Sequence, residues 1–146
     1  MLKRMVVFLL VLAISLSACG AKPTPQTLSG EAREAVVAYS EEMTDNLLEG
    51  LNAGDYATFS RDFTEQMKTS LSEAKFPDLS LQIIGNLGAY VSREIQSVEQ
   101  TGDFVALVYS AKFEQDDPVT VRVVFDVAEP HLVTGLWFDS AKLRQK

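Results

Sequence analysis

The chain has 146 residues, 47% of them hydrophobic, which is enough to build the core of one compact domain. Its formal net charge is −7, and residues 19–146 contain no cluster of lysine or arginine, which argues against a nucleic-acid-binding protein because phosphates require a basic surface. Cys19 is the only cysteine, so no disulfide can form within one chain.

The first 18 residues have the pattern of a targeting signal. A basic start at residues 1–4 precedes an apolar run at residues 5–16, which is shorter than the roughly 20 residues needed to span a bilayer. Residues 16–20 then read Leu-Ser-Ala-Cys-Gly. This segment closely resembles the lipobox of bacterial lipoproteins, in which the cysteine thiol is acylated and the preceding residues are removed.

That resemblance implies a lipidated Cys19 and a location on the extracytoplasmic side of the cell envelope. Two or more acyl chains hold a protein to a membrane lastingly, whereas one chain holds it only marginally. Loss of residues 1–18 removes Lys3 and Arg4 and moves the net charge from −7 to −9, so we expect membrane contact through the lipid alone. The alternatives are an ordinary secretory signal and a buried helix of a cytosolic protein.

Residues 19–29 are predicted to form a tether between the lipid and the domain. Pro23 and Pro25 interrupt this stretch, and it has no hydrophobic periodicity. At about 3 Å per residue, an extended tether of this kind keeps the domain within some tens of ångströms of the bilayer. The folded domain is expected to occupy residues 30–146.

Helices are predicted first along the domain. One long amphipathic helix is expected from Ser29, a plausible N-cap, to Asn52. Its apolar residues recur at helical spacing, at Val36, Tyr39, Met43, Leu47 and Leu51.

Shorter helices are predicted after Gly54, which suits a helix end. Asp55 can cap a helix over residues 56–59, and Thr64 can cap a third helix that carries Met67 and Leu71. Pro77 is expected to break that pattern, and Asp78 to start a fourth helix, in which Leu79, Ile83, Ile84 and Leu87 share a face until Gly88 ends it.

Alternating polar and apolar residues predict four antiparallel strands over residues 89–139, divided by turns at 101–103, 116–118 and 129–131. The turn lengths predict one apolar face, with the following opposed pairs: Val127 with Leu132, Phe125 with Thr134, Val123 with Leu136, Val121 with Phe138, Ala111 with Val121, Tyr109 with Val123, and Leu107 with Phe125. On the opposite face, the guanidinium of Arg122 is expected to lie over the indole of Trp137.

The expected fold is therefore α+β, with a long N-terminal helix and short helices packed on a curved four-stranded antiparallel meander, together forming a cone. Two segments carry a family resemblance. Residues 51–59, Leu-Asn-Ala-Gly-Asp-Tyr-Ala-Thr-Phe, resemble the helix-turn-helix entry of nuclear transport factor 2-like domains, and residues 133–140, Val-Thr-Gly-Leu-Trp-Phe-Asp-Ser, resemble the closing strand of domain of unknown function 3887. This superfamily contains binding modules as well as cyclases and isomerases, so the resemblance implies a fold more than an activity.

The strongest candidate for a chemical site lies in the first strand. A two-residue turn at Thr101-Gly102 sets Glu94 opposite Tyr109 and Tyr90 opposite Phe113, so that a desolvated carboxylate beside a phenol could act as a general base. The alternative is an edge strand with a bulge, in which Val91 and Ile95 take the inner face and Glu94 turns to water.

Other candidates are weaker. Tyr56, Phe59 and Phe63 could line the mouth of the cone, although aromatic residues at helix ends more often belong to a core. His131 is the sole histidine and is expected to be a solvated turn residue, and Asp116 and Asp117 lack the spaced ligands of a calcium loop. The sequence predicts no metal site and no cofactor.

Two classes of function remain open from the sequence. The preferred hypothesis is a lipid-anchored extracytoplasmic domain that binds a small apolar ligand or a protein and catalyses nothing. The alternative is a small-molecule enzyme, similar to an isomerase or cyclase, that uses Glu94 with Tyr109. A homodimer is compatible with either, through an outer sheet face where Val108, Val124 and Trp137 interrupt polar positions.

Overall fold

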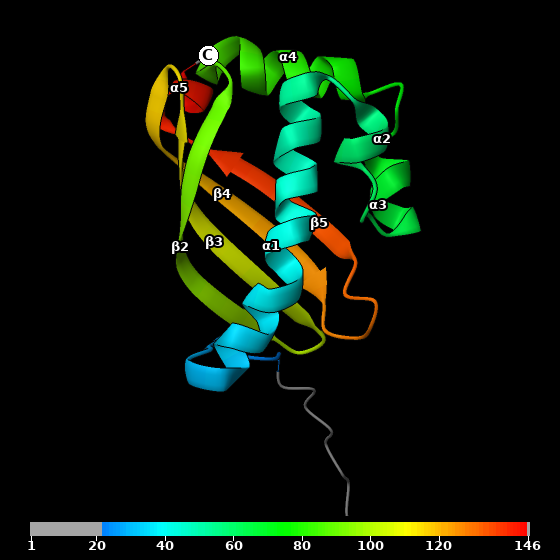
Figure 1. The fold of residues 1–146 in the computed structure, drawn as a ribbon, viewed down its shortest axis with the longest axis vertical. Coiled ribbons are helices and arrows are strands. Elements are labelled where there is room, and N and C mark those ends of the chain that lie inside the picture. Colours follow the sequence, from blue (N-terminus) through cyan, green and yellow to red (C-terminus); the bar gives the residue numbers. More distant parts are fainter. Residues whose placement is uncertain (1–21, 146) are drawn as a thin grey trace, which may run out of the picture.

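The computed structural model describes residues 22–145, so the predicted signal segment at residues 1–18 and Cys19 lie outside the described residues. The elements follow in the order shown in Figure 1: β1 (Gln26–Thr27), α1 (Gly30–Ala53), α2 (Tyr56–Phe59), α3 (Glu65–Ser70), α4 (Phe76–Leu87), β2 (Tyr90–Thr101), β3 (Phe104–Phe113), β4 (Asp116–Asp126), β5 (Val133–Asp139) and α5 (Ala141–Arg144). The predicted α+β class, with a long helix before an antiparallel meander, is confirmed.

The sheet has five strands in the order β1-β2-β3-β4-β5, so the prediction of four was wrong by one. The added strand comes from the segment expected to be a free tether: Gln26 pairs with Gln100 and Thr27 with Glu99. The amide of Leu28 continues the ladder by donating to the carbonyl of Val98 at 2.8 Å. A two-residue edge strand leaves almost no alternating pattern in a sequence, which is why the tether prediction missed it.

Two of the four predicted pairs of the last hairpin are confirmed, Val121 with Phe138 and Val123 with Leu136, whereas the predicted pair of Val127 with Leu132 is not part of the ladder. A bulge next to Val124 shifts the end of this ladder, so that Phe125 pairs with Val133 and not with Thr134.

The register of the β3–β4 hairpin was wrong by two residues. Tyr109 pairs with Val121, where Val123 was expected, because the chain turns earlier, after Phe113. A shift by an even number keeps every side chain on its own face of the sheet, so the predicted apolar face is the buried one.

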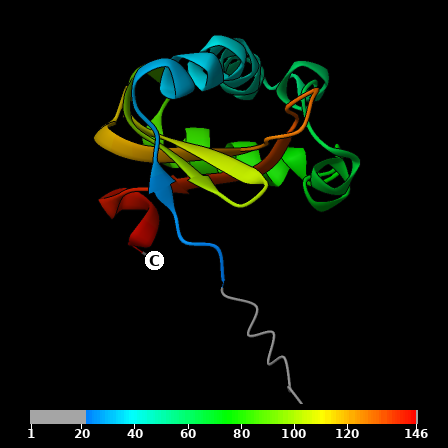
Figure 2. The same ribbon diagram turned by 90° about the horizontal axis from the view of Figure 1, so that it is seen from below.

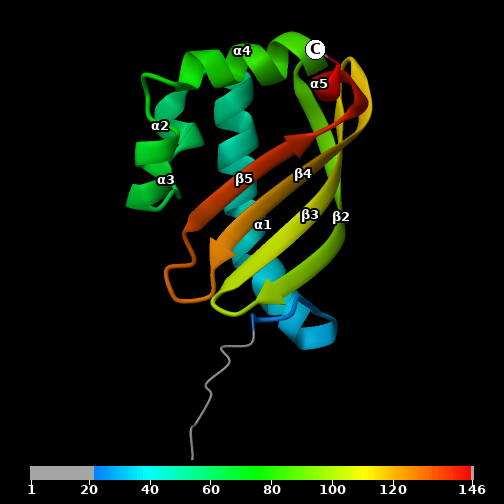
Figure 3. The ribbon, with the colours of Figure 1, turned by 180° about the vertical axis from the view of Figure 1, so that it is seen from behind.

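Helix α1 lies across the inner face of the sheet, with α2 and α3 beside it and α5 on the other side of the sheet (Figures 1 and 2). The buried residues of α1 recur at helical spacing, and they contact the inner positions of β3 and β4. The main contributors to this core are Leu47, Leu48, Leu51, Leu107, Tyr109, Val121, Val123 and Phe125. The opposite face of the sheet carries no helix across its middle (Figure 3).

The C-terminal end of α1 sets the path of the following helices. Gly54 ends the helix in the left-handed conformation with φ of 65°, and its amide bonds back to the carbonyl of Leu51. Gly50 allows α2 to approach closely, because a Cβ at this position would lie 2.2 Å from the backbone nitrogen of Phe59. The chain therefore folds back sharply against α1.

The predicted caps of α2 and α3 are confirmed, since Asp55 accepts from the amide of Ala57 and Thr64 from that of Met67. Helix α4 begins at Phe76, two residues before the predicted start at Asp78. Pro77 occupies the first turn, where its missing amide costs nothing, so it begins a helix here and does not break one. The final short helix α5 was not predicted.

Strand β2 is held at both ends by contacts outside the β2–β3 ladder. At its start, the side-chain amide of Asn52 donates to the carbonyl of Tyr90 at 2.9 Å and accepts from its amide at 2.8 Å. At its end, β1 covers Glu99 and Gln100. These contacts attach the start of β2 to the C-terminal end of α1, and the end of β2 to the strand that precedes α1.

Candidate functional site

The inner face of the sheet is filled by side chains where the sequence pointed to a cone pocket. Tyr109 has no exposed surface, and its hydroxyl donates to Oε1 of Glu41 at 2.9 Å and lies 3.2 Å from Oγ1 of Thr44. Burial is the main reason why the pKa of Tyr109 lies above its usual value, and Glu41 raises it further although Thr44 opposes the shift. The phenol is thus neutral and fully engaged.

Glu94 does not join Tyr109. It is exposed and pairs with Ser110, whereas Ile95 pairs with Tyr109. A register shift between Ile95 and Ser97 has produced the bulge that was the alternative reading of this strand, and that reading is confirmed for Glu94. Tyr90 does pair with Phe113, as predicted, with the ring centroids 5.8 Å apart.

Arg93, which pairs with Ala111, is the charged residue of this strand whose side chain is buried against α1. Its side chain is only 7% exposed, and it forms ion pairs with Asp45 at 2.6 Å and Glu41 at 3.2 Å. The guanidinium also donates to the hydroxyl of Tyr90 at 3.1 Å and lies 5.2 Å from the ring centroid of Tyr109. We refer to Glu41, Asp45, Tyr90, Arg93 and Tyr109 as the polar cluster.

Sequence reasoning missed Arg93, although a signal was present. Arg93 is two residues before Ile95, so placing Ile95 inward places Arg93 inward as well. The same prediction was wrong for Val91, which is exposed because a register shift between Tyr90 and Ser92 interrupts the alternation. Burial lowers the pKa of Arg93, but the hydrogen bonds with Asp45 and Tyr90 outweigh that effect and keep it above the ordinary value. The permanently charged guanidinium of Arg93 pairs with two carboxylates of α1 and so links α1 to β2, which suits a structural role.

The three aromatic candidates of the helical region form a packed cluster. Phe59 and Phe63 are buried with centroids 5.0 Å apart, and the half-buried Tyr56 donates its hydroxyl to the carbonyl of Leu71 at 3.0 Å. Phe76 joins this cluster, with its ring 4.7 Å from Phe59 and 5.6 Å from Tyr56. These residues belong to the core, and they support the wall of the groove described next.

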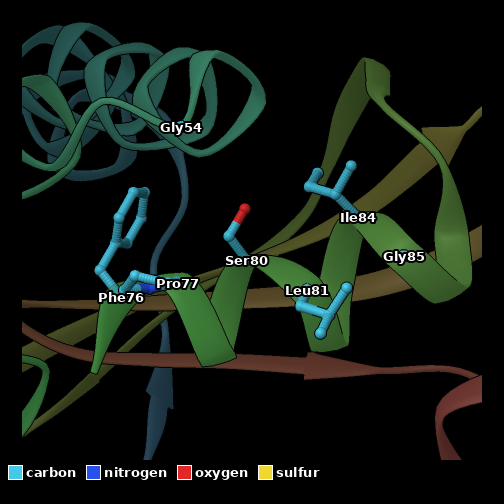
Figure 4. A pocket seen from close by; sticks show the side chains of 7 residues that line it. All are labelled: Gly54, Phe76, Pro77, Ser80, Leu81, Ile84 and Gly85. Carbon is cyan, nitrogen blue, oxygen red and sulfur yellow. The ribbon is translucent and has the colours of Figure 1, made fainter. Parts of the chain in front are cut away.

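An open apolar groove of about 490 Å³ lies on α4, next to the end of α1 (Figure 4). Leu81 stands at its edge and is 73% exposed, the largest exposure among the large hydrophobic residues of the described chain. Ser80 is the single side chain with a polar group among those lining the groove. The lining consists of Gly54, Phe76, Pro77, Ser80, Leu81, Ile84 and Gly85.

The sequence contained a signal for this groove that was not followed. Leu79, Ile83 and Leu87 place one face of α4 against the core, as predicted. Leu81 lies on the opposite side of the helix and is exposed. A helix that buries only one face needs no large apolar residue on the other, so Leu81 indicates a second apolar surface.

The outer sheet face differs from its prediction in one contact. Arg122 is opposite Trp137 in the ladder, as expected, but its guanidinium lies 3.5 Å from Glu99. In the described part of the chain, the one cation stacked on a ring is Arg93. The indole of Trp137 is 56% exposed and lies against Gly135, where a Cβ would come within 2.5 Å of it.

The remaining candidates, His131 and the acidic residues of the β3–β4 turn, make structural contacts. His131 is in the predicted turn, but it is half-buried and not solvated, because its ring stacks on Tyr39 with centroids 4.0 Å apart. Asp117 lies 3.8 Å from the ammonium group of Lys112. Among residues 22–145, no group of three acidic, histidine or cysteine side chains is placed to hold a metal ion.

A family model described as "Protein of unknown function (DUF3887)" matches residues 44–129, more than half of the chain. The chain belongs to the DUF3887 family. The DUF3887 region runs from the middle of α1 to the loop after β4, so it contains the whole groove and, apart from Glu41, the whole polar cluster. No curated protein and no solved structure gives a significant match. Among the described residues of this DUF3887 protein, no helix is long and apolar enough to cross a membrane.

Proposed function

We propose that this protein is a lipid-anchored, extracytoplasmic binding domain that holds apolar side chains of a protein partner in the groove on α4. The groove carries the proposal, because it combines an apolar lining with an exposed leucine at its edge on an otherwise acidic chain. Small ligands are mostly enclosed by the pockets that bind them, so an open groove of this kind fits a protein better than a small molecule.

The anchor and its location rest on the sequence Leu-Ser-Ala-Cys at residues 16–19. The basic start, the short apolar run and the single cysteine are all accounted for by a lipidated Cys19. A nuclear transport factor 2-like cone is part of the same proposal, supported by a long helix lying across one face of an antiparallel sheet.

The enzyme alternative has lost the pair of residues on which it depended. Glu94 is exposed and opposite Ser110, which places it on the outer face, while Tyr109 is buried on the inner face. The hydroxyl of Tyr109 is occupied by Glu41 and Thr44, so no substrate can reach it without separating α1 from the sheet. A binding function therefore has the better geometric support.

The test is site-specific photocross-linking in cells that natively produce the protein. A photoreactive residue replacing Leu81 should give an adduct of one defined mass, and the substitution Ile84→Asp, which puts a charge into the groove, should abolish it. Val91, an exposed apolar residue on β2, serves as the matched control position. Equal adducts from positions 81 and 91, or an adduct that survives Ile84→Asp, would contradict the groove as a binding site.

A second surface supports self-association. On the outer face, exposed Trp137 lies beside half-buried Val124, and the Arg122–Glu99 ion pair borders them. This face has a mixed composition, with apolar residues at the centre and charged residues around them, as is found in protein interfaces. We propose it as a homodimer interface independent of the groove.

A further inference from the structure

The N-terminal segment is attached to the sheet almost from its first described residue. Strand β1 pairs with the end of β2, and Leu28 extends that pairing. Pro23 packs on the β2–β3 turn, since a Cβ at Gly102 would lie 3.5 Å from its Cγ. Most of the segment expected to be a free tether is therefore part of the folded domain.

This attachment shortens the link to the proposed lipid. Four peptide units separate Cys19 from Pro23, and an extended chain covers at most about 3.6 Å per residue, so these two Cα atoms can be no more than about 14 Å apart. An unattached tether of residues 19–29 would reach more than twice as far. The domain has little freedom to move away from the bilayer or to turn over.

One end of the molecule is consequently fixed next to the membrane. The start of α1, the β2–β3 turn and the β4–β5 loop all lie at the end where the described chain begins, while α4 lies at the other end (Figures 1 and 3). Two apolar side chains are exposed at this near end, Phe104 at 48% and Val127 at 38%. Their segments are adjacent, because the amide of Val127 donates to the carbonyl of Asp103 at 2.9 Å.

We propose that this end of the domain contacts the lipid interface, with Phe104 and Val127 against the headgroup boundary. The inference rests on the proposed lipidation of Cys19. Acidic residues neighbour the two apolar residues, since Asp103 precedes Phe104 in the sequence, Asp126 pairs with Phe104 and Glu129 follows two residues after Val127, so attraction to anionic lipid is not the driving force. The short link sets the orientation, and the apolar pair provides a surface compatible with it.

The orientation gives the groove on α4 its access to partners. Helix α1 has 24 residues and runs from the membrane end to the groove, so the groove lies about 36 Å along it at 1.5 Å per residue. The groove then lies at the end of the domain that is farther from the bilayer.

The experiment uses the full lipidated protein in phosphatidylcholine vesicles that contain brominated acyl chains, which quench tryptophan at short range. In a Trp137→Phe background, single tryptophans replace Phe104 or, as the control at the far end, Leu81. Groups at the interface lie about 5–10 Å into the headgroup boundary, so we expect about twofold quenching for the tryptophan at position 104 and none at 81. Val127→Trp provides a second reporter if the Phe104 variant folds poorly.

A further variant tests the short link itself. Twelve glycine and serine residues inserted between residues 21 and 22 add a flexible segment of about 19 Å root-mean-square length, and the quenching at position 104 should be lost. Equal quenching at 104 and 81 would overturn the orientation, and quenching at 104 that survives the insertion would overturn the role of the link. Cys19→Ser separates the two proposals: if this variant stays on the vesicles, the lipid anchor is wrong, whereas an anchored parent without quenching at 104 refutes only the orientation.

Discussion

Two glycines inside helices should respond to alanine in opposite directions. Gly50 in α1 and Gly85 in α4 both occupy helix positions where alanine is intrinsically better by about 1 kcal/mol. A Cβ at Gly85 would meet only the flexible end of Leu81, at 3.4 Å. We therefore expect Gly85→Ala to raise the free energy of unfolding by up to about 1 kcal/mol, the intrinsic difference.

A Cβ at Gly50 meets the backbone of α2. It would lie 2.2 Å from the nitrogen and 2.6 Å from the Cα of Phe59, and backbone atoms cannot rotate away as a side chain can. Overpacking of a core costs about 1–3 kcal/mol, and a backbone obstacle belongs at the upper end of that range. After subtraction of the gain of about 1 kcal/mol in helix propensity, Gly50→Ala should destabilise the fold by about 2 kcal/mol.

Urea denaturation followed by circular dichroism measures both variants against the parent, with unchanged m-values as the check on two-state unfolding. The melting temperature of Gly50→Ala should fall by about 8 °C for a domain of this size, while that of Gly85→Ala should rise. If Gly50→Ala is as stable as the parent, the close approach of α1 and α2 has been misjudged, and with it the reason for a glycine at this position.

Three further predictions concern the polar cluster and the outer face. Removing the two carboxylates together, with Glu41→Ala and Asp45→Ala, should lower the free energy of unfolding by about 3 kcal/mol because it leaves a buried guanidinium unpaired. Arg93→Met should cost less, because both carboxylates are partly exposed and can be solvated; if urea denaturation finds Arg93→Met the less stable variant, the guanidinium is not the buried partner. Because the pKa of Tyr109 is raised in the folded state, its contribution to stability is complete below about pH 10, the pKa of an unfolded phenol, and is lost as the pH rises above that value. Tyr109→Phe should therefore flatten the alkaline fall in the free energy of unfolding, and an equally steep fall in both proteins would contradict the raised pKa. If the outer face forms a dimer, the parent should have twice the monomer mass in sedimentation equilibrium and Trp137→Ala should have the monomer mass; a monomeric parent removes that proposal.

The sequence was informative wherever a local rule determined the structure. The caps at Asp55 and Thr64, the end of α1 at Gly54 and the inner face of β3 and β4 follow from short-range patterns. A register error of two residues in one hairpin left the buried face correct, because strand side chains alternate with a period of two.

The sequence was less informative where contacts between distant segments decide the outcome. Arg93 becomes buried because Asp45 and Glu41 approach it from a helix 48 and 52 residues earlier in the chain, and an isolated arginine in a strand does not reveal those partners. Likewise, β1 exists because β2 offers it an edge, and the groove depends on how the end of α1 meets α4. These features depend on tertiary packing, which overrides local preference.

The two hydrogen bonds of Asn52 have a consequence for association between molecules. A side-chain carboxamide carries the same donor and acceptor as a peptide unit, so Asn52 bonds to the backbone amide and carbonyl of Tyr90 as a neighbouring strand would. With β1 covering the other end of β2, an incoming extended chain finds only the irregular middle of this edge, where two bulges disturb the spacing of its donors and acceptors. The domain thus carries built-in protection against sheet extension and amyloid-like aggregation along β2.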